Sequence, residues 1–87
     1  MTPDLDLIQS IIPGRWRLIG TTAVRQLGFF GIDRIEVYRR ADGSWCVDAM
    51  GVLYPRLATD PDLKTVLSRA SRVLLDHAEM LRKEITP

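Results

Sequence analysis

The sequence predicts an α+β fold, in which a three-stranded antiparallel meander carries a short N-terminal helix and a long C-terminal helix on one face. Two observations favour it: apolar residues recur at helical spacing through residues 61–84, and a turn signal at residues 41–43 separates two strand-like segments. The 87 residues are expected to form one domain, 1–87, in the order helix, strand, strand, strand, helix.

The composition is that of an ordinary soluble globule, with 46% hydrophobic residues, 26% charged residues and a net charge of +1. The single cysteine, Cys46, excludes an internal disulfide and fits a reducing compartment. No apolar run approaches the roughly 18 residues of a membrane span, and the acidic start does not resemble a signal peptide. We therefore expect a cytoplasmic protein that does not contact the membrane.

The N-terminal segment has the signals of a short helix. Thr2, followed by Pro3, is the expected cap and start, and Pro13 with Gly14 ends a helix of about ten residues. Its apolar stripe consists of Leu5, Ile8, Ile11 and Ile12. Because so short a helix is unstable alone, it must dock against the rest of the domain.

The next segment is expected to be a strand over residues 15–22, because basic and apolar residues alternate at its start. This alternation directs Trp16 and Leu18 toward the helices. Residues 23–31 leave two alternatives open: they continue the strand, or they form a loop.

Residues 32–40 and 44–53 are the clearest strands, and the loop between them indicates a hairpin. A two-residue turn would pair Val37 with Asp48, whereas a three-residue loop would pair Val37 with Val47. The three-residue loop is favoured because it collects apolar residues on one face, and a one-residue slip would move each of them to the other. That face would hold Ile35, Val37, Trp45, Val47 and Ala49.

This register has two further consequences. It requires Gly43 to have a positive φ angle. It also places Glu36 opposite Asp48 on the outer face, where Arg34 or an arginine of the first strand must screen the two carboxylates.

Residues 61–84 are expected to form the long helix, capped by Thr59 or Asp60 and with Pro61 in its first turn. Its stripe cannot stay in water, so the sheet must cover it. The stripe consists of Leu63, Val66, Leu67, Ala70, Val73, Leu74, Ala78 and Leu81.

The sequence contains no recognisable catalytic constellation. Cys46 and His77 are the only pair that could act as nucleophile and base, and no pattern brings them together. One histidine and one cysteine do not make a usual zinc site, and the glycine spacing does not match a phosphate-binding loop. We expect no catalytic residues, no metal and no cofactor, and thus not an enzyme.

Two surfaces are candidates for binding. The open face of the sheet should carry three arginines and an aromatic residue, which could hold RNA or single-stranded DNA by phosphate contacts and stacking. The alternative is that this face is merely solvated, since acidic residues interrupt it. The candidate residues there are Arg17, Arg34, Tyr38 and Arg40, with Met50 at an apolar end suited to dimerisation. Phe29 and Phe30, between glycines, could be an exposed tip that docks a partner or could cover the core.

Two family resemblances extend only to the order of elements. The hairpin and helix from Ile32 onward resemble antitoxins of the HicB type, but the proline-rich turn and later strand of that family have no counterpart here. The expected order also resembles that of double-stranded RNA-binding domains, whose lysine-rich helix start is replaced here by Asp60 and Asp62. The chain is assigned to neither family.

Elimination leaves a non-enzymatic protein–protein interaction module as the leading hypothesis, such as an inhibitor, an antitoxin-like protein or an accessory regulator. Its partner would be another protein or a second copy of the chain. The alternative is a nucleic-acid-binding module that uses the arginine-rich face. A third class, an enzyme whose site forms only at a subunit interface, stays open.

Overall fold

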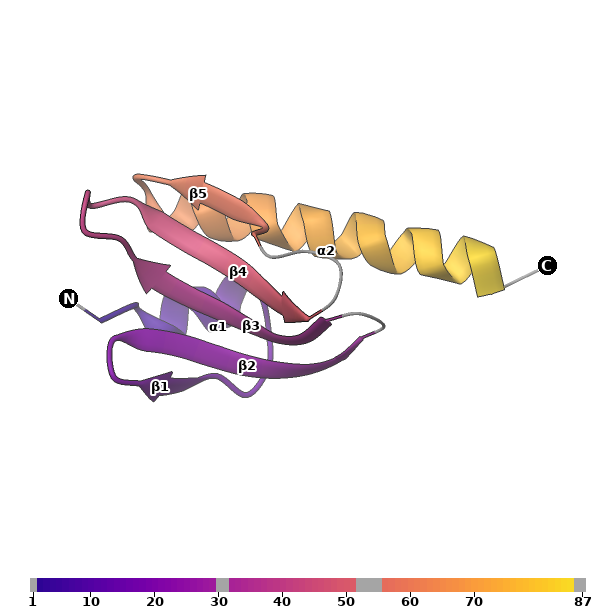
Figure 1. Ribbon diagram of the computed structural model, residues 1–87, viewed down its shortest axis with the longest axis horizontal. Helices are drawn as coiled ribbons and strands as arrows, with labels where there is room; N and C mark the ends of the chain where they lie inside the picture. Colours follow the sequence, from indigo (N-terminus) through magenta and orange to yellow (C-terminus); the bar gives the residue numbers. More distant parts are fainter. Residues whose placement is uncertain (1, 30–31, 52–55, 86–87) are drawn as a thin grey trace.

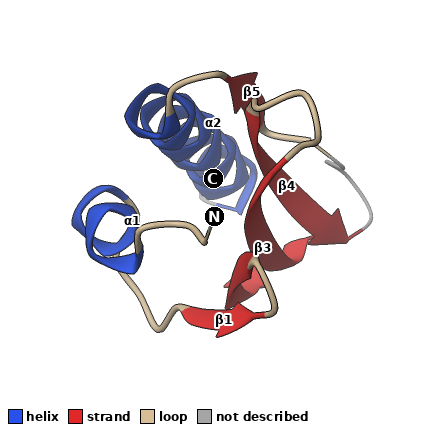
Figure 2. Ribbon diagram, turned by 90° about the vertical axis from the view of Figure 1, so that its left-hand side faces the viewer, coloured by secondary structure: helices blue, strands red, loops and turns tan. Residues whose placement is uncertain are grey.

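A computed structural model describes residues 2–29, 32–51 and 56–85. It confirms the α+β class but gives five strands instead of three, ordered β1-β2-β3-β4-β5, with each neighbouring pair antiparallel. Figures 1 and 2 show both helices on one side of the sheet, hereafter the inner side. The elements are α1 (Leu5–Ile11), β1 (Arg17–Ile19), β2 (Thr22–Phe29), β3 (Ile32–Arg39), β4 (Trp45–Gly51), β5 (Ala58–Asp60) and α2 (Leu63–Ile85).

The expected strand over residues 15–22 is in fact interrupted by a turn. Ile19 pairs with Thr22, so Gly20 and Thr21 form a two-residue hairpin loop. Gly20 has a φ of +63°, and no described residue other than glycine has a positive φ. This is the pattern of a type II′ turn, whose twist suits a tight hairpin. The two alternatives for residues 23–31 are thereby decided in favour of a strand as far as β2 extends.

The fifth strand lies where only a connection was expected. β5 pairs with β4 through Trp45 and Asp60, Cys46 and Thr59, and Val47 and Ala58. Just before it, the Leu57 N–H donates to the Val47 carbonyl at 2.8 Å. Three residues are too few to show a periodicity, which is why the sequence pattern did not reveal this strand.

The central hairpin has the favoured register. Val37 lies opposite Val47, Ile35 opposite Ala49, and Glu36 opposite Asp48. Gly43 has the required positive φ, +91°. Burying the apolar face of both strands therefore decided the loop length.

The core lies between the inner face of the sheet and the helices. Its central side chains are fully buried: Ile8, Ile35, Val37, Val47, Val66 and Leu67. Leu18 was expected among them but is 42% exposed. The reason is that α2 packs against β4, β5 and α1, which leaves β1 at the uncovered edge.

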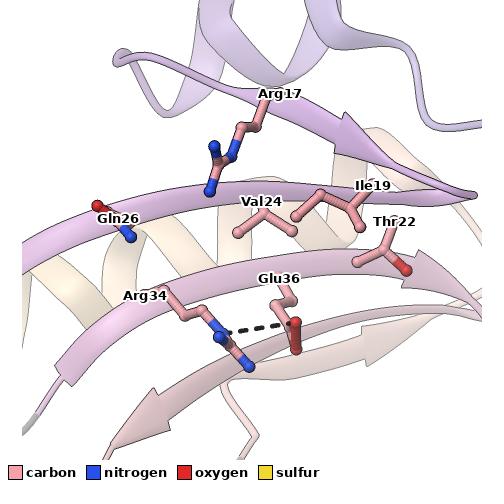
Figure 3. A pocket seen from close by; sticks show the side chains of 7 residues that line it. All are labelled: Arg17, Ile19, Thr22, Val24, Gln26, Arg34 and Glu36. Atoms are coloured by element: carbon pink, nitrogen blue, oxygen red, sulfur yellow. Dashed lines mark ion pairs between the residues drawn. The ribbon is translucent and has the colours of Figure 1, made fainter.

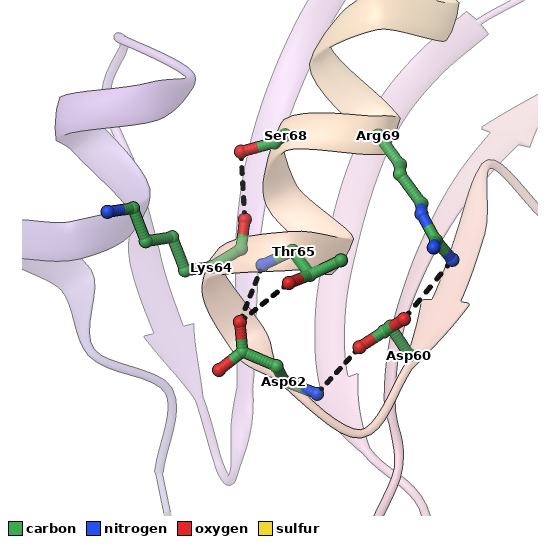
Figure 4. A network of polar contacts seen from close by, with 6 residues as sticks. All are labelled: Asp60, Asp62, Lys64, Thr65, Ser68 and Arg69. Atoms are coloured by element: carbon green, nitrogen blue, oxygen red, sulfur yellow. Dashed lines mark hydrogen bonds and ion pairs between the residues drawn. The ribbon is translucent and has the colours of Figure 1, made fainter.

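Both helices begin at an aspartate, not at the expected caps. The Asp4 carboxylate accepts hydrogen bonds from the N–H groups of Asp6 and Leu7, at 3.1 and 3.2 Å. Asp62 accepts from the N–H and the hydroxyl of Thr65, at 3.0 and 2.7 Å (Figure 4), and these bonds lower the pKa of its carboxyl group. The cap predictions for both helices were therefore wrong by two or three residues. In the described residues no helix combines the length and apolarity that a membrane crossing needs.

Candidate functional site

The outer face of the sheet, opposite the helices, carries three rows of side chains that follow from the strand pairing. Residues paired across neighbouring strands point to the same face. The first row is Arg17, Val24, Glu36 and Asp48; the second is Gln26, Arg34 and Met50; the third is Tyr38, Cys46 and Thr59.

Side chains from the first two rows, together with Ile19 and Thr22, enclose a shallow depression of about 330 Å³ on β1, β2 and β3, shown in Figure 3. It is lined by Arg17, Ile19, Thr22, Val24, Gln26, Arg34 and Glu36. Val24, 5% exposed, lies between the charged groups and supplies an apolar floor. The depression thus combines apolar surface with charged groups around it.

The two arginines of the depression differ in their surroundings. The Arg34 guanidinium lies 3.6 Å from the Glu36 carboxylate, so the expected screening of Glu36 is confirmed. Arg17 has no ion-pair partner among the residues that the structure describes. Arg17 therefore offers a positive charge to an incoming group.

A second polar group lies further along the outer face. The Tyr38 hydroxyl donates to Asp48 at 2.7 Å, and the Arg56 Nε donates to the same carboxylate at 3.3 Å. The hydrogen bond to Asp48, reinforced by burial and by the negative charge of Asp48, raises the pKa of Tyr38. Asp48 likewise raises the pKa of Arg56. Tyr38 is therefore anchored to its neighbours, and its hydroxyl is already engaged.

The predicted surface residues do not all gather in one place. Arg17, Arg34, Tyr38 and Met50 share the outer face, and Met50 lies opposite Arg34 with 38% of its surface exposed. Arg40 follows the end of β3 in the hairpin loop and does not line the depression. Phe30 and the side chain of Phe29 lie outside what the structure describes. The exposed phenylalanine tip therefore stays a prediction.

Cys46 and His77 lie on opposite sides of the sheet. Cys46 shares the outer face with Tyr38, but it is fully buried, with its sulfur 3.5 Å from the Thr59 hydroxyl. His77 belongs to α2 on the inner side and is also buried. Within the described ranges, no three histidine, cysteine or acidic side chains gather as metal ligands would.

Sequence reasoning missed the β2 side of the depression, namely Thr22, Val24 and Gln26. The signal that could have found it is Gly20 with Thr21, a glycine-first pair between two short apolar stretches. A second depression adjoins the first, lined by Arg15, Trp16, Arg17, Val24 and Gln26. Searches with family models, among curated proteins and among solved structures found no match to this chain.

Proposed function

We propose that this protein is a non-enzymatic interaction module that binds a protein partner through the outer face of its sheet. The observation that carries the proposal is the depression on β1–β3, where an apolar floor lies among guanidinium groups on the side away from the helices. Surfaces of this kind suit protein recognition, because interface cores favour arginine and apolar contacts over lysine and acidic residues.

The same residues indicate how binding energy would be distributed. Ile19, 55% exposed, offers apolar surface for burial by a partner, whereas Val24 is already buried between the charged groups. Arg17 is open to a carboxylate, whereas Arg34 is already oriented by Glu36. Binding energy should therefore concentrate at Arg17 and Ile19, in the manner of a small hot spot.

Nucleic-acid binding is the second candidate, favoured by the presence of Arg17 and Arg34 on one face with Tyr38. Two features of the outer face weigh against it. Glu36 and Asp48 carry negative charge on the same face, and Tyr38 is tied to Asp48. Phosphate contacts need a net positive surface, so the protein partner is the better supported choice.

The proposal is tested by capturing proteins from the native host on the immobilised wild type and on two charge-reversal variants. Arg34→Glu changes the depression, and Arg72→Glu makes the same change at an exposed position on α2. We expect a partner that the wild type and Arg72→Glu retain and that Arg34→Glu loses by about tenfold or more. Equal capture by all three proteins contradicts the proposal. A salt-sensitive shift with mixed oligonucleotides instead would favour the nucleic-acid candidate.

A further inference from the structure

The sheet ends at β1, beyond which no strand is present in the described part of the chain. Gly20–Thr21 is a two-residue loop, so its closing pair, Ile19 and Thr22, is expected to exchange backbone hydrogen bonds. Such pairs alternate with non-bonded pairs along an antiparallel ladder. Leu18, next to the closing pair, therefore directs its N–H and C=O away from β2, toward the open edge.

The side chains at this edge are apolar on both faces. Leu18 is 42% exposed on the inner side, and Ile19 is 55% exposed on the outer side. The described residues contain only two other exposed large hydrophobic side chains, Met50 and Leu75. Natural proteins usually protect an open edge with charge, proline or a covering element. Among the residues that the structure describes, this edge has charge, all of it positive, and it is also short, at three residues.

The charges in the chain segment around β1 have one sign. Residues 7–32 contain three arginines, Arg15, Arg17 and Arg25, and no acidic residue. Arg15 and Arg17 line the same depression beside the edge, and both are exposed. A second copy of this chain, paired edge to edge through β1, would bring like charges together. An acidic segment would meet complementary charge at Arg15 and Arg17.

We propose that the β1 edge accepts an extended protein segment with alternating acidic and apolar residues, which adds a sixth strand to the sheet. The acidic side chains would lie on the outer face beside Arg15 and Arg17, and the apolar ones would lie on the inner side against Leu18. Strand addition of this kind takes its affinity from main-chain hydrogen bonds and its specificity from alternate side chains. The proposal deepens the proposed function by naming the class of partner, and it rests on that function.

The test uses a short capped peptide of alternating glutamate and valine, with an otherwise identical lysine–valine peptide as the charge control. Binding is followed by backbone amide shifts of the labelled protein. We expect the glutamate peptide to shift the amide signals of β1 and of the adjoining part of β2. The shifts should be smaller at high salt, and the amide signals of β5 should not move. Equal binding of the lysine peptide, or shifts confined to β5 and α2, would overturn the proposal.

Two substitutions at Leu18 separate main-chain from side-chain contributions. Leu18→Pro removes the outward N–H without removing a β1–β2 hydrogen bond, whereas Leu18→Ala keeps the N–H and shortens the side chain. We expect Leu18→Pro to bind the glutamate peptide about tenfold more weakly than Leu18→Ala, the loss typical of one good hydrogen bond. Similar affinities for two variants with similar thermal midpoints would exclude strand addition.

Arg17→Glu provides a check that does not depend on the proline variant. It should abolish binding of the glutamate peptide and favour the lysine peptide, and retention of the original preference would contradict the proposal. If no acidic peptide binds but Arg34→Glu still loses the captured host partner, the strand proposal fails and the proposed function stands. Sedimentation of the protein alone tests whether two copies pair through β1. A dimer that Leu18→Pro dissociates would assign the edge to a second copy and overturn the proposal.

Discussion

The two edges of the sheet are built differently. At the β5 edge, Asp60 forms an ion pair with Arg69 of α2 at 3.1 Å and accepts a hydrogen bond from the Asp62 N–H (Figure 4). β5 is therefore tied to the long helix that closes the core. At the β1 edge, all three residues are exposed, and the nearby charges are arginines. One edge is attached to a helix through an ion pair, and the other is basic and uncovered.

This difference separates stability from recognition within a domain of 87 residues. So small a domain has little stability to spare, so its core must be compact and well covered. In the half of the sheet formed by β4 and β5, α2 provides this cover. We call this half the covered side and the half at β1 the uncovered side. The β1 side is left with surface that contributes little to folding, and it is there that substitutions can change binding without unfolding the protein.

The largest expected effect is on the covered side. Leu67→Ala removes a fully buried side chain of α2 and should lower the free energy of unfolding by about 2 to 5 kcal/mol. Leu18→Ala, at the uncovered edge, should change it by less than about 0.5 kcal/mol. Urea denaturation of both variants checks the contrast, and equal losses would show that the two edges do not differ in this way.

A smaller effect is expected at the hairpin that joins the two sides. Gly43→Val should lower the free energy of unfolding by about 1 kcal/mol or more, because a β-branched residue is strained at a positive φ. The space around Gly43 is not the cause, since a Cβ added there would lie 3.6 Å from its nearest neighbour, a nitrogen of the Arg39 guanidinium. Denaturation of Gly43→Val beside Gly43→Asn, which tolerates this conformation better, distinguishes backbone strain from crowding.

The two hairpins also show what can be predicted from sequence. In the β3–β4 hairpin, only one register puts Ile35, Val37 and Val47 on one face, so burial determines the pairing. In the β1–β2 hairpin, Leu18, Ile19 and Val24 do not mark a single buried face, because β1 is an edge strand. The one sequence feature that indicated this hairpin was Gly20, because glycine favours the first position of such a tight turn. The number of strands was therefore underestimated where burial does not constrain the chain.

The residues of the candidate site could likewise be predicted only where burial fixes the register of the strands. Alternation along β3 and β4 placed Arg34, Tyr38 and Met50 on the outer face correctly. The contact of Arg56 with Asp48 could not be foreseen, because it depends on the path of the chain between β4 and β5. The apolar floor at Val24 likewise depends on the missed turn.

Acid should affect the covered side through Asp62. Hydrogen bonds from Thr65 lower the pKa of Asp62 below its ordinary value of 3.8. Its contribution to stability is therefore fully present above that value and is lost as the pH falls through the folded-state pKa. Asp62→Asn keeps a capping oxygen without the titration, so its stability should depend less steeply on pH below about 4. Identical acid profiles for the two proteins would contradict this role.

The smallest effect is local to the outer face. Since the hydrogen bond to Asp48 is the main cause of the raised pKa of Tyr38, Asp48→Ala, which removes the acceptor, should bring that pKa back toward 10.0. The other tyrosine, Tyr54, is replaced by phenylalanine in both proteins, so that alkaline absorbance titration reports on Tyr38 alone. An unchanged titration would mean that burial, not Asp48, sets the pKa.

The measurement that tests the central claim most directly is amide hydrogen exchange of the protein, alone and with the partner captured by the wild type. Binding at the uncovered side should slow exchange in β1 and in the β2 segment around Val24, and leave β5 unchanged. Slowed exchange at Thr59 and the first turn of α2, with none at Leu18, would place recognition at the covered edge and contradict the account.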